Sequence, residues 1–405
     1  MQIILFEDHL IAELRPVILS RPAFAINMCG TNLYNLVRNK GKEISYIIRD
    51  YLKEITSREF PNQILKDKSL LFLNASLVPS VSILNEIFDK IKRGDAFLAQ
   101  SDFRVVVAFF PNLKFNLTTQ NERSITNFLR SQEYRLLENH FPLINYSFDI
   151  IRYNPCYFEE NLRYMKRNYR QVSPGVFVGK DVHIHPTVCL DSKEGTIIIE
   201  NKATIGPLVY LKGPLYIGDN SKIIERTSIK EYSYISHTCK VGGEVESSII
   251  ESYSNKQHHG FLGHSYVGSW VNLGAGTSTS DLKNTYGDIT VEYQGKKIPT
   301  GMQFLGCIIG DHSKTAINTS IFTGKIIGVS SYIYGFVTAN VPSFSNYAKT
   351  FGQITEYYLD SAIRTQKRMF SRRGIKQEHL HIKLLEDIYE TTRDERLMST
   401  KELSL

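Results

Sequence analysis

An aliphatic repeat of six residues in the second half of the chain constrains the fold more than any other feature. Eight aliphatic residues follow one another at this interval from Ile199 to Val241. The interval also holds from Val172 to Leu190, and it returns at Val267 and from Ile309 to Ile333. It matches neither the helical period of about 3.6 nor the strand period of about 2. It predicts a left-handed parallel β-helix, a coil with three flat faces that each point one aliphatic side chain inward.

Glycine directly follows many of these aliphatic positions, as at Gly206, Gly218 and Gly242. We expect these glycines at the corners of the coil, where backbone freedom is needed. The repeat breaks between Ser278 and Phe304, where polar residues replace it. Such an excursion is either a place for binding residues or a tolerated surface insertion.

The first 150 residues have a different pattern, in which short apolar runs alternate with helical spacing. Predicted strands are Ile3–Phe6, Ser45–Ile48, Leu70–Asn74, Ala96–Ala99 and Val105–Phe109, and predicted helices are 32–37 and 81–92. This alternation predicts an α/β domain with a mostly parallel sheet. We therefore divide the chain into an α/β domain (1–150), a linker (151–171), the β-helix (172–345) and a helical extension (346–405). The helices of the extension would cap or brace the end of the coil.

Composition excludes several classes of protein. No apolar stretch approaches the roughly 20 residues that span a bilayer, and the amino terminus reads as a first strand rather than a signal peptide. We therefore expect a cytoplasmic protein without a membrane partner. The five cysteines form no C-x-x-C pair, which argues against a disulfide framework and a thiolate zinc site. The net charge of +7 is mild, and the basic residues between Arg364 and Lys376 read as a solvated helix face rather than a nucleic-acid site.

The segment from Asn255 to Gly287 carries the motifs that identify a family. They are Asn-Lys-Gln-His (255–258), Gly-Phe-Leu-Gly-His-Ser (260–265), Trp-Val-Asn-Leu-Gly-Ala-Gly-Thr (270–277) and Leu-Lys-Asn-Thr-Tyr-Gly (282–287). On these motifs the chain resembles the GlmU-like family of sugar nucleotidyltransferases. That family includes the bifunctional enzyme of UDP-N-acetylglucosamine biosynthesis, which joins a uridylyltransferase to a glucosamine-1-phosphate acetyltransferase.

The resemblance implies transfer of an acetyl group from acetyl-CoA to an amino-sugar phosphate or a nucleotide sugar, by a homotrimer. His258 aligns with the family's general base, and imidazole suits that role near neutral pH. The turn from Asn272 to Gly276 would offer backbone N–H groups to the oxyanion. The other residues that the resemblance assigns are Lys230, Lys256, Phe261, Asn272, Asn284 and Tyr286 for the substrate, and Ala275, Gly276 and Gly335 for acetyl-CoA.

Departures from the family pattern leave the acceptor open. Phe261 stands where the bifunctional enzyme has a tyrosine, and Lys230 stands where it has a phosphate-binding arginine. A second substrate lysine aligns with Ser248, and Lys240 or Lys256 could replace it. Several of these residues also have a structural interpretation; Asn272, for example, could form a side-chain ladder inside the coil.

A zinc enzyme resembling the γ-class carbonic anhydrases is an alternative. His259 and His264 would supply two imidazoles, and His237, His258 or His312 a third. A β-helix that serves only as a scaffold or regulator is a further possibility.

The resemblance in the amino-terminal domain rests on Leu19-Ser20-Arg21-Pro22 and Phe72-Leu73-Asn74. No glycine-rich phosphate-binding loop follows the first strand, although Arg15 and Arg21 could meet phosphate. Two interpretations stay open: a working nucleotidyltransferase, which could use Mg²⁺, and a degenerate domain that only binds a nucleotide sugar.

Overall fold

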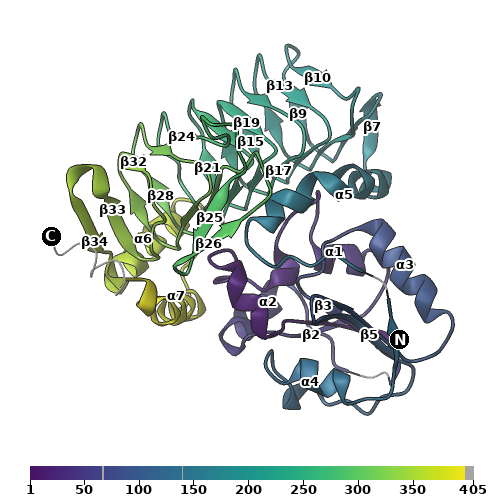
Figure 1. Ribbon diagram of the computed structural model, residues 1–405. Helices are drawn as coiled ribbons and strands as arrows, with labels where there is room; N and C mark the ends of the chain where they lie inside the picture. The colour runs from purple at the N-terminus through teal and green to yellow at the C-terminus, as the bar shows by residue number, and fades with distance from the viewer. Residues whose placement is uncertain (66–67, 139, 397–405) are drawn as a thin grey trace. The chain divides into compact units, whose positions relative to one another are not determined.

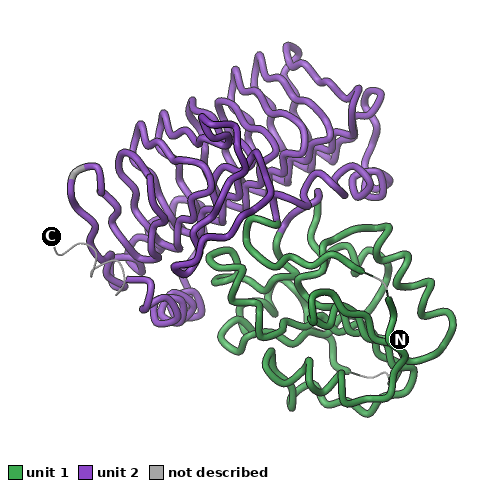
Figure 2. The backbone as a smooth tube through the Cα atoms, in the orientation of Figure 1, with its two compact units in different colours: residues 1–26, 31–149 green, residues 27–30, 150–405 purple. Residues whose placement is uncertain are grey.

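The computed structural model describes residues 1–65, 68–138 and 140–396. These residues form two compact units (Figure 2). The first comprises residues 1–26 and 31–149, and the second comprises 27–30 together with the chain from 150 onward. Along the described residues no helix is both long and apolar enough to cross a membrane. Residues 397–405 of the predicted helical extension lie outside the described part.

The first unit contains a six-stranded sheet in the order β2-β1-β3-β5-β4-β6. The strands are β1 (Gln2–Phe6), β2 (Ile44–Ile47), β3 (Leu70–Asn74), β4 (Phe97–Ser101), β5 (Arg104–Phe110) and β6 (Arg135–Leu137). The helices are α1 (Leu33–Arg38), α2 (Lys53–Glu59), α3 (Val81–Ile91) and α4 (Ile125–Arg130), with short 3₁₀ turns η1 (His9–Leu14), η2 (Ala23–Ala25), η3 (Asp50–Leu52) and η4 (Leu117–Thr119). The predicted strands and the two predicted helices are therefore present, and the α/β class is confirmed.

The sheet is mostly parallel, as predicted, since β1–β2, β1–β3 and β4–β6 pair in parallel. The exception is β5, which runs antiparallel to both β3 and β4. A two-residue turn joins β4 to β5, and both its residues, Asp102 and Phe103, have left-handed φ angles of 47° and 62°. Such a turn builds a hairpin in place of a helical crossover. Its residues lack the Asn-Gly signature that would have revealed it.

The second unit is a parallel β-helix, as predicted (Figure 1). Its first face holds β8 (Val176–Val178), β11 (Ile197–Ile199), β14 (Leu215–Ile217), β17 (Ser233–Ile235), β20 (Ile249–Ile250), β23 (Tyr266–Val267), β27 (Cys307–Ile309) and β30 (Lys325–Ile327). The second face holds β9 (His183–Ile184), β12 (Thr204–Ile205), β15 (Lys222–Ile223), β18 (Lys240–Val241), β21 (Asn255–Lys256), β28 (Lys314–Thr315), β31 (Tyr332–Ile333) and β33 (Ser345–Ala348). The third face holds β10 (Cys189–Asp191), β13 (Tyr210–Lys212), β16 (Ser228–Ile229), β19 (Glu244–Glu246), β22 (Phe261–Gly263), β24 (Ser278–Thr279), β29 (Ser320–Ile321) and β32 (Phe336–Val337).

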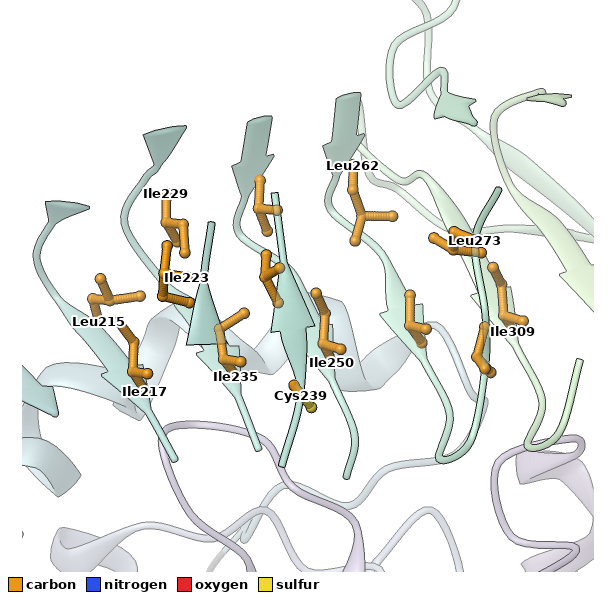
Figure 3. Close-up of a cluster of buried hydrophobic side chains, with 14 of the residues drawn as sticks. Leu215, Ile217, Ile223, Ile229, Ile235, Cys239, Ile250, Leu262, Leu273 and Ile309 are labelled. Carbon is orange, nitrogen blue, oxygen red and sulfur yellow. The ribbon is translucent and has the colours of Figure 1, made fainter. Parts of the chain in front are cut away.

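The aliphatic repeat forms the core of this coil. All eight residues from Ile199 to Val241 are buried in a single cluster. Figure 3 shows the same arrangement, with Leu215, Ile223 and Ile229 pointing into the coil from different strands. Val172 is an exception to the predicted register: it is 43% exposed, because it lies in β7 (Arg170–Ser173), an antiparallel strand at the start of the first face.

Glycine is required after the aliphatic positions for a different reason from the predicted one. At the corner after β14 the left-handed residue is Asn220, with a φ angle of 56°, and not Gly218. A Cβ atom on Gly218 would lie 2.6 Å from the backbone carbon of Ser236 in the next coil. The glycine is therefore required by close approach between coils and not by backbone freedom.

Three further segments pack on the coil. Residues 151–171, predicted as a linker, contain most of α5 (Asp149–Met165) and η5 (Lys166–Asn168). The Asn154 amide in α5 donates to the Tyr232 carbonyl at 2.7 Å, and the Thr196 N–H donates to the Glu159 carboxylate at 2.8 Å.

The break in the repeat forms a hairpin of β25 (Thr290–Tyr293) and β26 (Lys296–Pro299).

The helices α6 (Leu359–Ser371) and α7 (His379–Thr391) follow the coil. The sequence predicts that they cap or brace the end of the coil, and α7 does brace it: Tyr389 packs on Phe344 in the last coil with ring centroids 5.0 Å apart. The preceding helix, α6, lies further back along the coil. Phe370 packs on Trp270 with ring centroids 4.5 Å apart, and Tyr357 packs on Tyr332 at 4.4 Å. The last strand of the second face is β34 (Gln353–Glu356), which follows η6 (Lys349–Phe351) and pairs antiparallel with β33.

Candidate active site

His258 lies in the turn between the second and third faces, where the chain passes from β21 to β22. Its side chain is exposed. Gly260 closes the turn with a φ angle of 123°, and a Cβ atom there would lie 2.1 Å from the Thr277 carbonyl oxygen. Only glycine fits this conformation. The turn therefore presents an imidazole to the outside on a backbone that is closely packed against the next coil.

Lys256 lies inside the coil, although the resemblance assigns it to the substrate. Its partner in the preceding coil is the buried Val241, and Lys256 itself is only 3% exposed. The ammonium donates to the carbonyl oxygens of Gly260 at 2.7 Å, Gly242 at 2.8 Å and His258 at 3.3 Å. Burial lowers the pKa of Lys256 to about 8. The lysine thus holds the turn that carries His258 from within.

The residues predicted to meet acetyl-CoA lie on the same corner as His258. The Gly276 N–H donates to the His259 carbonyl at 3.2 Å, and the Asn318 N–H donates to the Ala275 carbonyl at 2.7 Å. Gly335 lies at the same corner two coils further on, just after β31, and its carbonyl accepts from the Ser320 N–H at 3.0 Å. The backbone N–H of Ala275 donates no hydrogen bond within the described part of the chain, which leaves it available to an oxyanion.

The predicted substrate residues are distributed over several places. Asn272 is exposed on the second face, so the alternative of a ladder inside the coil is wrong; its Oδ1 accepts from the Asn255 amide at 3.4 Å on the outside. Phe261 begins β22, three residues after His258. Asn284 and Tyr286 are exposed in the excursion, and Tyr286 is 69% exposed.

Lys230 lies on the third face between two carboxylates. Its ammonium is 2.8 Å from Glu244 and 2.9 Å from Glu246, and these hydrogen bonds raise its pKa above the ordinary value. A lysine neutralised in this way would have to exchange its partners to bind a phosphate. This geometry opposes the role that the resemblance gives to Lys230.

The histidines of the zinc alternative lie at different corners. His259 lies at the second-to-third corner, His264 at the third-to-first corner, and His237 and His312 where the first face meets the second. No group of three His, Cys, Asp or Glu among the described residues could hold a metal ion. The geometry does not support a zinc site.

A pairing that the sequence did not reveal joins His264 to Asp281. The His264 Nδ1 atom is 2.8 Å from the Asp281 carboxylate, and its ring stacks on Phe304 with centroids 5.2 Å apart. Asp281 and Phe304 lie at the two ends of the excursion, so His264 connects both ends to the coil. The two residues are 17 positions apart and lie on successive coils, so no local sequence signal revealed this contact.

In the first unit, charged residues gather at the carboxyl ends of β1, β2 and β3, where open α/β sheets bind ligands. The Arg49 guanidinium binds both oxygens of Glu7, at 2.9 and 3.0 Å. The Arg104 guanidinium binds both oxygens of Asp8, each at 2.9 Å. Both carboxylates are buried. This edge is therefore occupied by internal ion pairs.

Arg15 and Arg21 lie on the segment that follows η1 and are both partly buried. The Arg15 Nε atom is buried and makes no hydrogen bond to the described residues. The Arg21 carbonyl accepts from Arg49 at 3.0 Å. Their role in binding phosphate stays a prediction.

Comparison with known proteins shows which families parts of the chain resemble. Residues 3–169 match the model of the sugar nucleotidyl transferase family. The resemblance to GlmU-like proteins is confirmed. The chain is 35% identical over 149 residues to a bifunctional sugar-1-phosphate nucleotidylyltransferase/acetyltransferase of Sulfurisphaera tokodaii, which covers 36% of this chain and 37% of that protein. It is 30% identical over 189 residues to a bifunctional protein GlmU of Thermotoga petrophila, covering 42% of this chain and 38% of that protein.

The chain matches less than two thirds of the length of either relative. Among solved structures it aligns with a UDP-N-acetylglucosamine acyltransferase of Arabidopsis at 14% identity, over 57% of this chain and 91% of that chain. The TM-score of that alignment is 0.28, too low to carry an argument.

Proposed function

We propose that this protein is an N-acetyltransferase that uses acetyl-CoA and acts on an amino-sugar phosphate or a nucleotide sugar resembling glucosamine 1-phosphate. The observation that carries the proposal is the shared corner of His258, Ala275, Gly276 and Gly335. His258, Ala275 and Gly276 lie on two successive coils at one edge, and Gly335 lies at the same edge two coils further on. The names of the bifunctional GlmU relatives support the same chemistry.

The geometry suggests how the chain's own groups would act. The acceptor amine attacks the thioester carbonyl carbon, the carbon–sulfur bond breaks, and CoA leaves as a thiolate. His258, held outward by its turn, takes the proton from the amine and returns it to the thiolate. The Ala275 N–H is the donor for the oxyanion that forms in between. We further propose that the protein is a homotrimer, since an exposed corner by itself gives little enclosure to a ligand.

We propose that the first unit binds a nucleotide sugar without catalysis. Nucleotidyl transfer assisted by Mg²⁺ needs carboxylates that are free to bind the ion. Glu7 and Asp8 are instead held by Arg49 and Arg104, so these residues do not fit a magnesium site. The match of residues 3–169 to the nucleotidyl transferase family favours active transfer as a second candidate.

Two assays separate these proposals. Release of free CoA from acetyl-CoA, with glucosamine 1-phosphate and a panel of amino-sugar nucleotides as acceptors, tests the acetyltransferase. Release of pyrophosphate from UTP or dTTP with a sugar 1-phosphate tests the second candidate. Binding of a nucleotide sugar without pyrophosphate release supports the non-catalytic first unit.

A further inference from the structure

Lysines on the second and third faces of the β-helix differ in whether they have acidic partners. On the third face, Lys212 lies 2.9 Å from Glu194 and 3.3 Å from Glu231, and Lys230 also lies between two glutamates. Each of these ammonium groups is neutralised by the coil itself. The third face therefore has no need of an external anion.

On the second face, lysines stack without acidic partners. Lys222 and Lys240 are register partners in β15 and β18, and Asn255 follows as the partner of Lys240 in β21. We call this column of Lys222, Lys240 and Asn255 the second-face ladder. The Arg373 guanidinium also contacts it, donating to the Asn255 side chain at 2.8 Å. No ion pair involves Lys222, Lys240, Arg372 or Arg373 within the described part of the chain. Like charges directly opposite one another destabilise a sheet.

The electrostatics agree with this crowding. Burial and then the charges of Arg373, Lys222 and Arg372 lower the pKa of Lys240. The geometry places two of these cations beside Lys240: Lys222 is its register partner, and Arg373 donates to Asn255, its partner in the next coil. Arg372 directly precedes Arg373 in the chain. Lys222 and Arg372 are exposed, so an anion from solution can reach them.

We propose that Lys222, Lys240, Arg372 and Arg373, with the Asn255 amide, form a binding site for a phosphate group. Asn255, the last member of the ladder, lies only three residues before His258 in the chain. The site therefore adjoins the corner assigned to acetyl transfer. The choice of ligands rests on the proposed acetyltransferase function. Phosphate is common to the 3′-phosphate of CoA and to the phosphate of an acceptor sugar, and the unpaired cations suit either source.

The test is a binding titration of the full chain by calorimetry, with ligand pairs that differ by one phosphate. CoA is compared with dephospho-CoA, and glucosamine 1-phosphate with glucosamine. The variant is Lys222→Met with Lys240→Met, and the matched control is Lys212→Met on the third face. Unchanged circular dichroism shows that each variant is folded.

We expect the double variant to bind the phosphorylated member of one pair about tenfold more weakly or worse, since each lost contact is a charge-assisted hydrogen bond. Its affinity for the dephosphorylated member should not change, and Lys212→Met should bind as wild type does. The affected pair identifies the source of the phosphate. Equal affinity of wild type and double variant for all four ligands overturns the site.

The outcome is separable from the proposed function. Acetyl transfer by the wild type, together with unchanged phosphate binding by the double variant, refutes only the ladder site. Phosphate binding that depends on the two lysines, without acetyl transfer to any acceptor, refutes the acetyltransferase and retains the site.

Discussion

The ammonium nitrogen of Lys256 lies 3.3 Å from the carbonyl oxygen of His258. Lys256 occupies a core position that aliphatic residues fill in the neighbouring coils, such as Val241 before it and Leu273 after it. A buried cation in such a column is stable only when its hydrogen bonds are satisfied. Three carbonyl groups do this, and all three belong to glycine or histidine residues in the turns at one corner. The core of the coil is thereby coupled to the backbone of the proposed base.

Replacing Lys256 with methionine removes this coupling while keeping most of the side-chain volume. We expect a loss of about 2–4 kcal/mol in the free energy of unfolding, since buried carbonyls lose their donor. We also expect acetyl transfer to fall by at least about tenfold because the His258 turn loosens. Urea denaturation and the CoA-release assay measure the two effects. Lys212→Met, which removes two ion pairs near the surface of the third face, should change stability much less than Lys256→Met does.

The pH dependence of stability gives a second test of Lys256. Its pKa is about 8 in the folded protein, against about 10.4 in an unfolded chain. Between these values the unfolded state binds more protons, so the contribution of Lys256 to stability rises with pH. The free energy of unfolding of wild type minus that of Lys256→Met should therefore increase from pH 7 to pH 10, by up to about 3 kcal/mol. A difference that stays flat over this range would show that the ammonium is not buried.

Gly260→Ala tests whether the turn of His258 depends on close approach. The new Cβ would lie 2.1 Å from the Thr277 carbonyl oxygen, at a φ angle of 123°. We expect the free energy of unfolding of the variant to fall by about 3 kcal/mol or more. Acetyl transfer should be lost as well. At Gly287, in contrast, the nearest atom would be 3.9 Å away. Gly287→Ala should therefore change the melting temperature little, and an equal effect of both variants would contradict the account.

Asp281→Ala tests the connection between His264 and the excursion. Removing the carboxylate leaves His264 without its partner at 2.8 Å and frees the first end of the segment from 282 to 304. We expect faster hydrogen exchange of the amides in this segment, which carries Asn284 and Tyr286, with little change in the strands of the coil. Exchange rates identical to those of the wild type would show that the pairing does not hold the excursion.

The sequence predicted the fold where one pattern dominates the packing. The six-residue interval from Ile199 to Val241 revealed the coil because every member faces the same core. The pattern failed where packing departs from it: Val172 keeps the interval but lies in an antiparallel strand at the edge. The β4–β5 hairpin was missed because Asp102 and Phe103 adopt a left-handed turn without its usual residues.

The candidate site was predictable in its motifs but not in its side-chain directions. Lys256 resembles a substrate ligand in sequence, yet period-two alternation along β21 turns it into the core. Lys230 resembles a phosphate ligand, yet glutamates in the next coil neutralise it. Contacts between successive coils join residues some 16 positions apart, so a linear motif contains only one of the partners.

The most direct test of the central claim is release of CoA from acetyl-CoA by wild type and His258→Ala, each with the best acceptor of the panel. Because the imidazole is exposed, its removal should leave the folded coil unchanged by circular dichroism. The account predicts release by the wild type and a fall of about a hundredfold or more in the variant, as expected for loss of a general base. Equal rates in the two proteins, or no release with any acceptor, would contradict it.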